Sequence, residues 1–171
     1  FIILLPGRLT NWKGQKIFIE ALNFLFTQDD TQPLQGIILG SDQGRRVYKK
    51  QLISLVEQYR LSKVIKFIEH CEEMPVAYRI ANLVCSCSSE PEAFGRISVE
   101  SQSMEVPIIA SDIGGSKETI IKDKTGFLFK NNDSNDLANT IRAVMKKDYN
   151  SLKFIGSEGR RNVLKKFDVD K

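Results

Sequence analysis

Cysteine, histidine and long apolar segments are all scarce in this sequence. Its 171 residues include three cysteines and one histidine. An odd cysteine count without a secretory segment argues against a disulfide framework and for a reducing compartment. No apolar stretch approaches the length of about 20 residues that a membrane-spanning helix needs, and the apolar first residues lack the flanks of a signal peptide. We therefore expect a cytoplasmic globular protein, with the inner face of the plasma membrane as one place of action.

The common phosphate-binding and hydrolase motifs are also missing. None of the eleven glycines forms the pattern G-x-G-x-x-G, so a nicotinamide or flavin site has no support. The pattern G-x-x-x-x-G-K-[ST] of P-loop nucleotide hydrolases does not occur. Without G-x-S-x-G and with a single histidine, a Ser-His-Asp triad is not expected. The net charge of +4 is spread along the chain, which does not indicate a nucleic-acid-binding face.

The cysteines raise one alternative, a zinc site. Cys85 and Cys87 lie in an apolar run that indicates a buried strand, in which both side chains would point to one face. His70 and Cys71 are the other candidate ligands. The spacing is not that of ordinary zinc motifs, so we expect no metal site.

Strand-like and helix-like segments alternate from end to end. The strands are short continuous apolar runs, as in a parallel sheet that is covered on both faces. They are expected at 1–5, 36–39, 64–68, 83–87, 107–110 and 127–129. Helices are expected at 13–26, 47–59, 75–81, 96–104, 117–121, 136–147 and 152–167. This alternation predicts an α/β fold, a Rossmann-like doubly wound parallel sheet in one domain over residues 1–171, with ligands at the carboxyl ends of the strands.

Two carboxylates flank the expected start of the helix at 96–104. Glu92 lies in the loop before this helix, and Glu100 lies within it, roughly 7 Å along the axis from Gly95. Unpaired N–H groups and the helix dipole make such a helix start a seat for phosphate, and Gly95 permits close approach to the backbone. Because carboxylates accept hydrogen bonds from vicinal hydroxyls, a diphosphate with a sugar at each end fits this spacing. A solvated acidic loop remains the alternative.

Five blocks of sequence, in order, resemble one enzyme family. Glu92 and Glu100 match the E-x7-E motif of the GT-B retaining glycosyltransferases of family 4, and E-P-E-A-F-G-R (residues 90–96) is close to the wording of a bacterial subgroup. The other blocks are G-R-L with K-G (7–14), I-L-G (38–40), P-I-I-A-S-D-I-G-G with Glu118 (107–118) and T-G-F-L (125–128). The resemblance covers nearly the whole chain and implies the C-terminal, nucleotide-sugar-binding half of such an enzyme, with the N-terminal acceptor domain absent.

The resemblance assigns roles to individual residues. It gives Arg8 and Lys13 to the donor diphosphate, where cations stabilise the charge of the departing group. It gives Glu92 to the transferred sugar and Glu100 to the ribose. The remaining expected donor-site residues are Gly7, Phe94, Gly95, Arg96, Gly114, Gly115 and His70, which lies in the loop at 68–71 that would hold the base through its backbone. For His70, an ordinary loop histidine is the alternative; for Phe94, simple packing; for the glycine pair, a tight turn.

These assignments imply a retaining hexosyltransferase that needs no metal or other cofactor. Its partners would be a nucleotide-sugar donor, a saccharide or lipid-linked acceptor and its own N-terminal domain, with no nucleic acid and with peripheral membrane association allowed. Cell-envelope polysaccharide or lipopolysaccharide synthesis is the expected pathway. The alternatives are an epimerase or phosphorylase of the same fold, and a non-catalytic nucleotide-sugar-binding domain. Glu69, Asn82 and Glu105 depart from the family pattern of Gly, Asp and Gly, and Glu69 puts the base-binding loop in doubt.

Overall fold

A computed structural model describes residues 1–27 and 33–167. Within these residues, six parallel strands form one sheet in the order β3-β2-β1-β4-β5-β6. The strands are β1 (Ile2–Pro6), β2 (Gln35–Leu39), β3 (Ile65–Ile68), β4 (Leu83–Ser86), β5 (Ile108–Ser111) and β6 (Phe127–Phe129). The predicted α/β doubly wound sheet is confirmed. Strand order reverses between β1 and β4, the point at which such sheets bind ligands.

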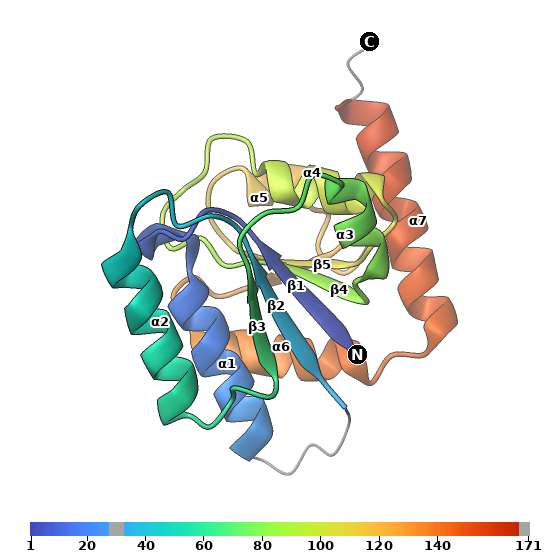
Figure 1. Cartoon of the computed structure of the whole chain (residues 1–171). Coiled ribbons are helices and arrows are strands. Elements are labelled where there is room, and N and C mark those ends of the chain that lie inside the picture. The colour runs from blue at the N-terminus through green and yellow to red at the C-terminus, as the bar shows by residue number, and fades with distance from the viewer. Residues whose placement is uncertain (28–32, 168–171) are drawn as a thin grey trace.

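Helices cover both faces of this sheet (Figure 1). They are α1 (Gln15–Thr27), α2 (Arg46–Gln58), α3 (Met74–Ile80), α4 (Arg96–Ser103), α5 (Ser116–Thr119), α6 (Ser134–Met145) and α7 (Tyr149–Lys166), with a 3-10 turn, η1, at Asn11–Lys13. Each predicted helix is present in the described residues, with its ends shifted by a few residues. None of the described helices combines the length and the apolar character that crossing a bilayer requires.

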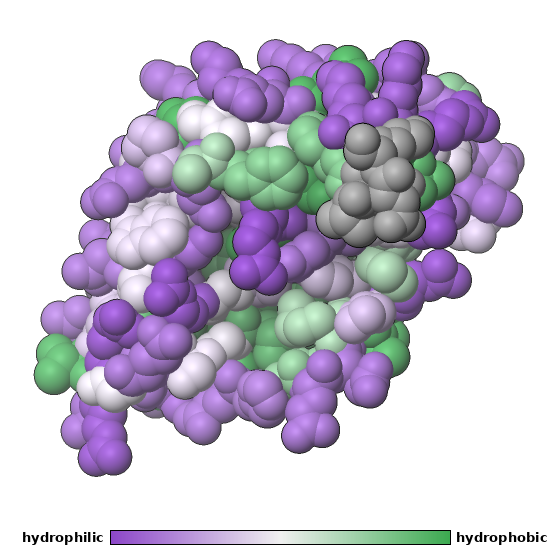
Figure 2. Space-filling model, turned by 90° about the horizontal axis from the view of Figure 1, so that it is seen from above, coloured by the Kyte–Doolittle hydropathy of each residue, from purple (hydrophilic) through white to green (hydrophobic). Residues whose placement is uncertain are grey.

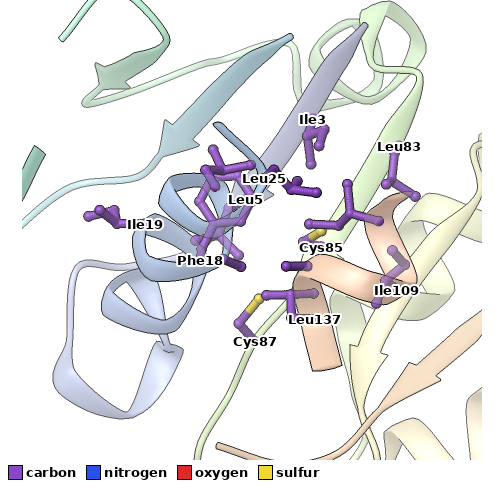
Figure 3. Packing of buried hydrophobic residues seen from close by; sticks show 14 of the residues in the cluster. Ile3, Leu5, Phe18, Ile19, Leu25, Leu83, Cys85, Cys87, Ile109 and Leu137 are labelled. Carbon is purple, nitrogen blue, oxygen red and sulfur yellow. The ribbon is translucent and has the colours of Figure 1, made fainter. Parts of the chain in front are cut away.

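Two hydrophobic clusters lie on opposite faces of the sheet. The larger joins β1 and β4 to α1, α2 and α6, and Phe18, Leu83 and Leu137 are fully buried in it (Figure 3). Cys85 and Cys87 both belong to this cluster, which confirms that they share one face. The smaller cluster joins the other face of the sheet to α3 and α4.

The helix predicted to begin at Lys13 begins two residues later. Lys13 ends the 3-10 turn, and Gly14 follows with a φ of 73°. A Cβ on Gly14 would lie 1.8 Å from the carbonyl oxygen of Cys87, so only glycine allows this turn to approach the end of β4. The turn therefore places Lys13 beside the loop that follows β4.

Candidate functional site

A cavity of about 770 Å³ opens at the carboxyl edge of the sheet, beside the β1/β4 switch point. Its wall comes from the end of β1, the turn after it, the loop after β4, and the facing sides of α3 and α4. Figure 2, seen from above, shows a largely hydrophilic face with hydrophobic residues around a recess near its centre. Six of the predicted site residues line the cavity: Gly7, Arg8, Lys13, Glu92, Arg96 and Glu100.

Lys13 and Glu92 form an ion pair at one end of the cavity. The Nζ atom of Lys13 lies 2.8 Å from Oε1 of Glu92, and the two side chains are only 12% and 15% exposed. The buried Ser88 donates a hydrogen bond from its hydroxyl to the same oxygen. Partial burial strengthens such pairs relative to surface pairs. The cation and the carboxylate are therefore held at fixed positions at this end of the cavity.

The turn that carries Lys13 is tied to the loop after β4. The Ser89 backbone N–H donates to the carbonyl oxygen of Trp12 at 2.7 Å, and the Ser89 hydroxyl donates to the same oxygen at 3.3 Å. The Lys13 ammonium also lies 4.5 Å from the centroid of the Trp12 ring, within the range of a cation–π contact. These contacts fix Lys13 relative to Glu92, although the two residues are far apart in the sequence.

Arg8 and the start of α4 supply further groups for an anion. The Arg8 side chain is exposed and pairs with no carboxylate of the described residues. Gly95 is the N-cap of α4 with a φ of 75°, so no side chain caps the helix. The N–H groups of Arg96 and Ile97 have no acceptor among the residues described here. Free N–H donors and the helix dipole favour a negatively charged group at this point.

Glu100 lies farther along the same wall and is held from two sides. The Tyr78 hydroxyl, on α3, donates to Oε2 of Glu100 at 2.7 Å, and the Arg96 guanidinium donates to Oε1 at 3.0 Å. Burial, and then the hydrogen bond to Glu100, raise the pKa of the Tyr78 phenol far above its ordinary value, so this group remains a donor. Beyond Glu100 the wall turns apolar, with Met74, Pro75 and Met104.

Gly114 and Gly115 act behind the cavity wall instead of lining it. The Gly115 N–H donates to the Glu92 carbonyl oxygen at 2.8 Å. A Cβ on Gly115 would lie 2.4 Å from the Phe94 carbonyl carbon, and one on Gly114 would lie 2.7 Å from the Glu92 carbonyl oxygen. The glycine pair thus lets the turn after β5 press against the loop of Glu92.

Gly95, Phe94 and His70 are likewise outside the cavity lining. Gly95 contributes through the helix start. The Phe94 ring is 46% exposed and meets Phe167, after α7, edge to face with ring centroids 5.5 Å apart. His70 lines a separate apolar pocket of about 170 Å³ on the other side of α3, with Ile68 and Val76. The structure therefore does not bring the His70 side chain to the cavity.

Two of the three departures from the family pattern are explained by their contacts. Glu69 forms an ion pair with Lys49 on α2, and neither residue lines the cavity. Its charge is therefore directed away from the candidate site. Asn82 accepts a hydrogen bond from the Ile2 N–H at 2.7 Å, which joins β4 to β1.

Sequence reasoning missed several contributors. Tyr78 and Ser88 hold the two carboxylates, Trp12 holds Lys13, and Met74 and Met104 form the apolar end. No motif marks these positions, because each depends on which helices and loops meet in space. For Ser88 a signal exists in its spacing of four residues from Glu92.

The cysteines form no metal centre in the part of the chain that the structure describes. No group of three or more His, Cys, Asp or Glu side chains is placed to hold a metal ion there. Cys85 and Cys87 are buried on one face of the sheet, whereas Cys71 packs on the other. Burial raises the pKa of the Cys87 thiol, which keeps it protonated and inert.

Comparisons with known proteins agree with this geometry. A solved glycosyltransferase from Rickettsia africae is 30% identical, with a TM-score of 0.93 over 99% of this chain and 44% of that one. Anabaena Alr3699/HepE, solved in complex with UDP-glucose, is 30% identical with a TM-score of 0.91 over 99% of this chain and 45% of that one. The C-terminal domain of a group 1 glycosyl transferase (LpcC) from Francisella tularensis is 26% identical, with a TM-score of 0.84 over 98% of this chain and 86% of that one.

Curated relatives are longer than this chain. D-inositol 3-phosphate glycosyltransferase from Corynebacterium glutamicum is 27% identical over 149 residues, which are 86% of this chain and 35% of that protein. The chain thus spans about a third of the length of this relative. The six-stranded parallel sheet with its helices matches the fold of GT-B glycosyltransferase structures. The sequence profile of the family described as "Glycosyl transferases group 1" matches residues 1–162, so the chain belongs to that family.

Proposed function

We propose that this chain binds the donor in a retaining hexosyltransferase. The donor is a nucleoside diphosphate sugar, and the acceptor is a saccharide or a lipid-linked saccharide. The observation that carries the proposal is the meeting of Arg8, Lys13, Glu92 and Glu100 with the free start of α4 in one cavity at the strand switch point. The UDP-glucose complex of the Anabaena neighbour supports a ligand of this class.

We place the diphosphate between the two carboxylates of the cavity, Glu92 and Glu100. Arg8, Lys13 and the N–H groups of Arg96 and Ile97 surround it in the proposal. Two unit charges about 4 Å apart interact by roughly 4 kcal/mol at an effective dielectric constant of about 20. As the bond between the sugar and the diphosphate breaks, negative charge builds on the departing oxygen, and these groups stabilise it more than they stabilise the bound donor.

The two carboxylates bind the two sugars of the donor. Glu92, fixed by Lys13 and Ser88, accepts hydrogen bonds from hydroxyls of the transferred hexose. Glu100 accepts them from the ribose, and the base lies against the apolar end at Met74 and Met104. The acceptor oxygen bonds to the anomeric carbon on the face that the diphosphate leaves. The acceptor proton passes to the departing phosphate oxygen, which retains the configuration.

Donor binding in this proposal needs no metal ion. Arg8, Lys13 and the α4 start carry the positive charge that a divalent cation supplies in other transferases. Titration with EDTA tests this point: transfer should persist at its full rate, and loss of activity that Mg²⁺ or Mn²⁺ restores would contradict it.

Residues outside this chain provide the acceptor site in this proposal, because the chain matches only 35% of the curated relative's length. We place the reaction in the cytoplasm, including the inner face of the plasma membrane, where three free cysteines stay reduced. The sequence of residues 90–96, which is similar to that of a bacterial subgroup, supports a role in cell-envelope polysaccharide or lipopolysaccharide synthesis.

Mass spectrometry and NMR of reaction mixtures test the proposed function. The protein, within its longer enzyme, is incubated with UDP-, GDP- and ADP-hexoses and a panel of saccharide acceptors. We expect a mass gain of one hexose on an acceptor and an anomeric proton signal of the same configuration as in the donor. Conversion of the donor without an acceptor would point to an epimerase, phosphate-dependent cleavage to a phosphorylase, and binding without turnover to a non-catalytic domain.

A further inference from the structure

Glu100 is anchored by one buried partner and one exposed partner. Tyr78 is 2% exposed and packs among the apolar side chains of the smaller cluster, between α3 and the sheet. The Arg96 side chain is 81% exposed, and its pair with Glu100 spans one helical turn. Exposed ion pairs of this kind order a side chain only weakly. The phenol of Tyr78 is therefore the contact that fixes the Glu100 carboxylate.

The orientation of this carboxylate matters for its proposed ligand. Two adjacent ribose hydroxyls donate to both oxygens of one carboxylate only when the carboxylate plane faces them. The Glu100 side chain is 38% exposed and would otherwise sample several rotamers. Tyr78 occupies one acceptor position of Oε2, and each carboxylate oxygen has room for a further donor.

We propose that Tyr78 is a positioning residue that sets the Glu100 carboxylate for ribose, so that α3 contributes to selection of ribonucleotide donors. This inference rests on the proposed function, because it assumes that Glu100 binds the ribose. The buried phenol remains protonated at all physiological pH values, so the hydrogen bond is permanently available. Tyr78 touches no reacting atom and acts through Glu100.

Calorimetry on the Tyr78→Phe variant tests the inference. The ligand is whichever of UDP, GDP and ADP the wild-type protein binds most tightly, together with its 2′,3′-dideoxy analogue. We expect the variant to bind the ribonucleotide about five- to tenfold more weakly, because binding must then also order the rotamers of the Glu100 side chain. Its affinity for the dideoxy analogue should equal that of wild type, because that analogue has no 2′ or 3′ hydroxyl to donate a hydrogen bond to Glu100.

Two controls separate positioning from a general structural effect. Tyr59→Phe removes a hydroxyl from a half-buried tyrosine that packs against the larger cluster, on the opposite face of the sheet, and should change neither affinity. In the Glu100→Ala background, Tyr78→Phe should cause no further loss, since the residue it positions is gone. Thermal melts of all variants confirm that each remains folded at the assay temperature.

Three results would overturn the inference. Equal weakening of both ligands would mean that Tyr78 only shapes the cavity. An unchanged ribonucleotide affinity would mean that Glu100 needs no anchor, and an undiminished Tyr78→Phe effect in the Glu100→Ala background would mean that Tyr78 acts by another route. Failure of wild type to bind any of the three diphosphates would instead reject the proposed function on which the inference rests.

Discussion

The two faces of the sheet are covered by different kinds of packing. On the face of α1, α2 and α6, the buried side chains form one large apolar cluster. On the face of α3 and α4, a smaller apolar cluster is accompanied by buried amides that join α4 to α7. There, Asn162 of α7 donates to Gln102 of α4 at 3.2 Å, and both side chains donate to the Thr119 carbonyl oxygen at 3.0 Å.

One face of the sheet serves mainly as a scaffold, whereas the other face carries part of the candidate site. The larger cluster stabilises the sheet mainly through apolar contacts, and on that side the buried Gln15 donates to the Arg8 carbonyl oxygen at 2.9 Å. The smaller side carries the polar wall of the cavity: Tyr78, Arg96 and Glu100 all come from α3 and α4. The amide network fixes α4, α5 and α7 to one another, and so keeps Glu100 in register with the loop of Glu92. Changes on the two faces should therefore have separable effects.

The largest effect is expected for Phe18→Ala on the scaffold face. The Phe18 side chain is fully buried in α1, and its removal should lower the free energy of unfolding by about 3–5 kcal/mol. Urea unfolding measures this loss. Below the unfolding transition, nucleoside diphosphate affinity should equal that of wild type. If the nucleoside diphosphate affinity fell while the protein stayed folded, the two faces of the sheet would not act independently.

The next effect concerns the cations of the site. We expect Lys13→Ala and Arg8→Ala each to lower kcat/KM by about a hundredfold or more in the longer enzyme, as when one transition-state donor is lost. Lys16→Ala is the matched control, because Lys16 is 67% exposed and pairs only with Glu20 among the residues described. Near-wild-type rates for Lys13→Ala or Arg8→Ala would show that the residue is a surface charge.

Gly115→Ala probes the support behind the cavity. The added Cβ would lie 2.4 Å from the Phe94 carbonyl carbon, so the loop of Glu92 must shift. We expect a loss of activity of at least about tenfold, since a misplacement of about 1 Å can lower rates a hundredfold. Gly44→Ala is the control, because its Cβ would meet nothing within 4 Å and the backbone strain at its φ of 83° falls in a turn that does not line the cavity. Equal activity of both variants would show that Gly114 and Gly115 do not support the loop of Glu92.

The smallest effect is a gain in stability for Glu105→Gly, at the end of α4. Glu105 has a φ of 60°, in the left-handed region that favours glycine. Relief of this strain should raise the free energy of unfolding by about 1 kcal/mol, less the contribution of its exposed pair with Arg160. A thermal melt measures the gain, and a lower melting temperature would show that the ion pair outweighs the strain.

Much of the fold could be predicted from sequence, because its signals are local. Apolar runs such as the one around Cys85 and helical stripes such as the one around Leu52 repeat with the period of their own element. The start of α1 differs from the prediction because the Gly14 turn depends on contact with Cys87, which follows β4 and is far away in the sequence. Helix ends that are set by long-range packing leave no local signal in the sequence.

The sequence motifs pointed to the charged residues of the candidate site. They did not point to the residues that hold those side chains in place through packing. Arg8, Lys13, Glu92 and Glu100 lie in recognisable blocks, and all four line the cavity. Tyr78 reaches Glu100 only because α3 packs beside α4, which no spacing along the chain reveals. The base-binding role predicted for the backbone of the loop at 68–71 stays a prediction, and the side chain of His70 lines a separate pocket on the other side of α3.

The most direct test of the account is calorimetry with a free nucleoside diphosphate on Glu100→Ala and Glu92→Ala. The ligand has a ribose and a diphosphate but no transferred sugar. We predict that Glu100→Ala weakens binding by about tenfold or more, as for lost hydrogen bonds to a charged group, and that Glu92→Ala does not weaken it, because Lys13, released from its pair with Glu92, can still meet the diphosphate. Equal losses in the two variants, or a loss only in Glu92→Ala, would contradict the assignment of the two carboxylates to the two sugars.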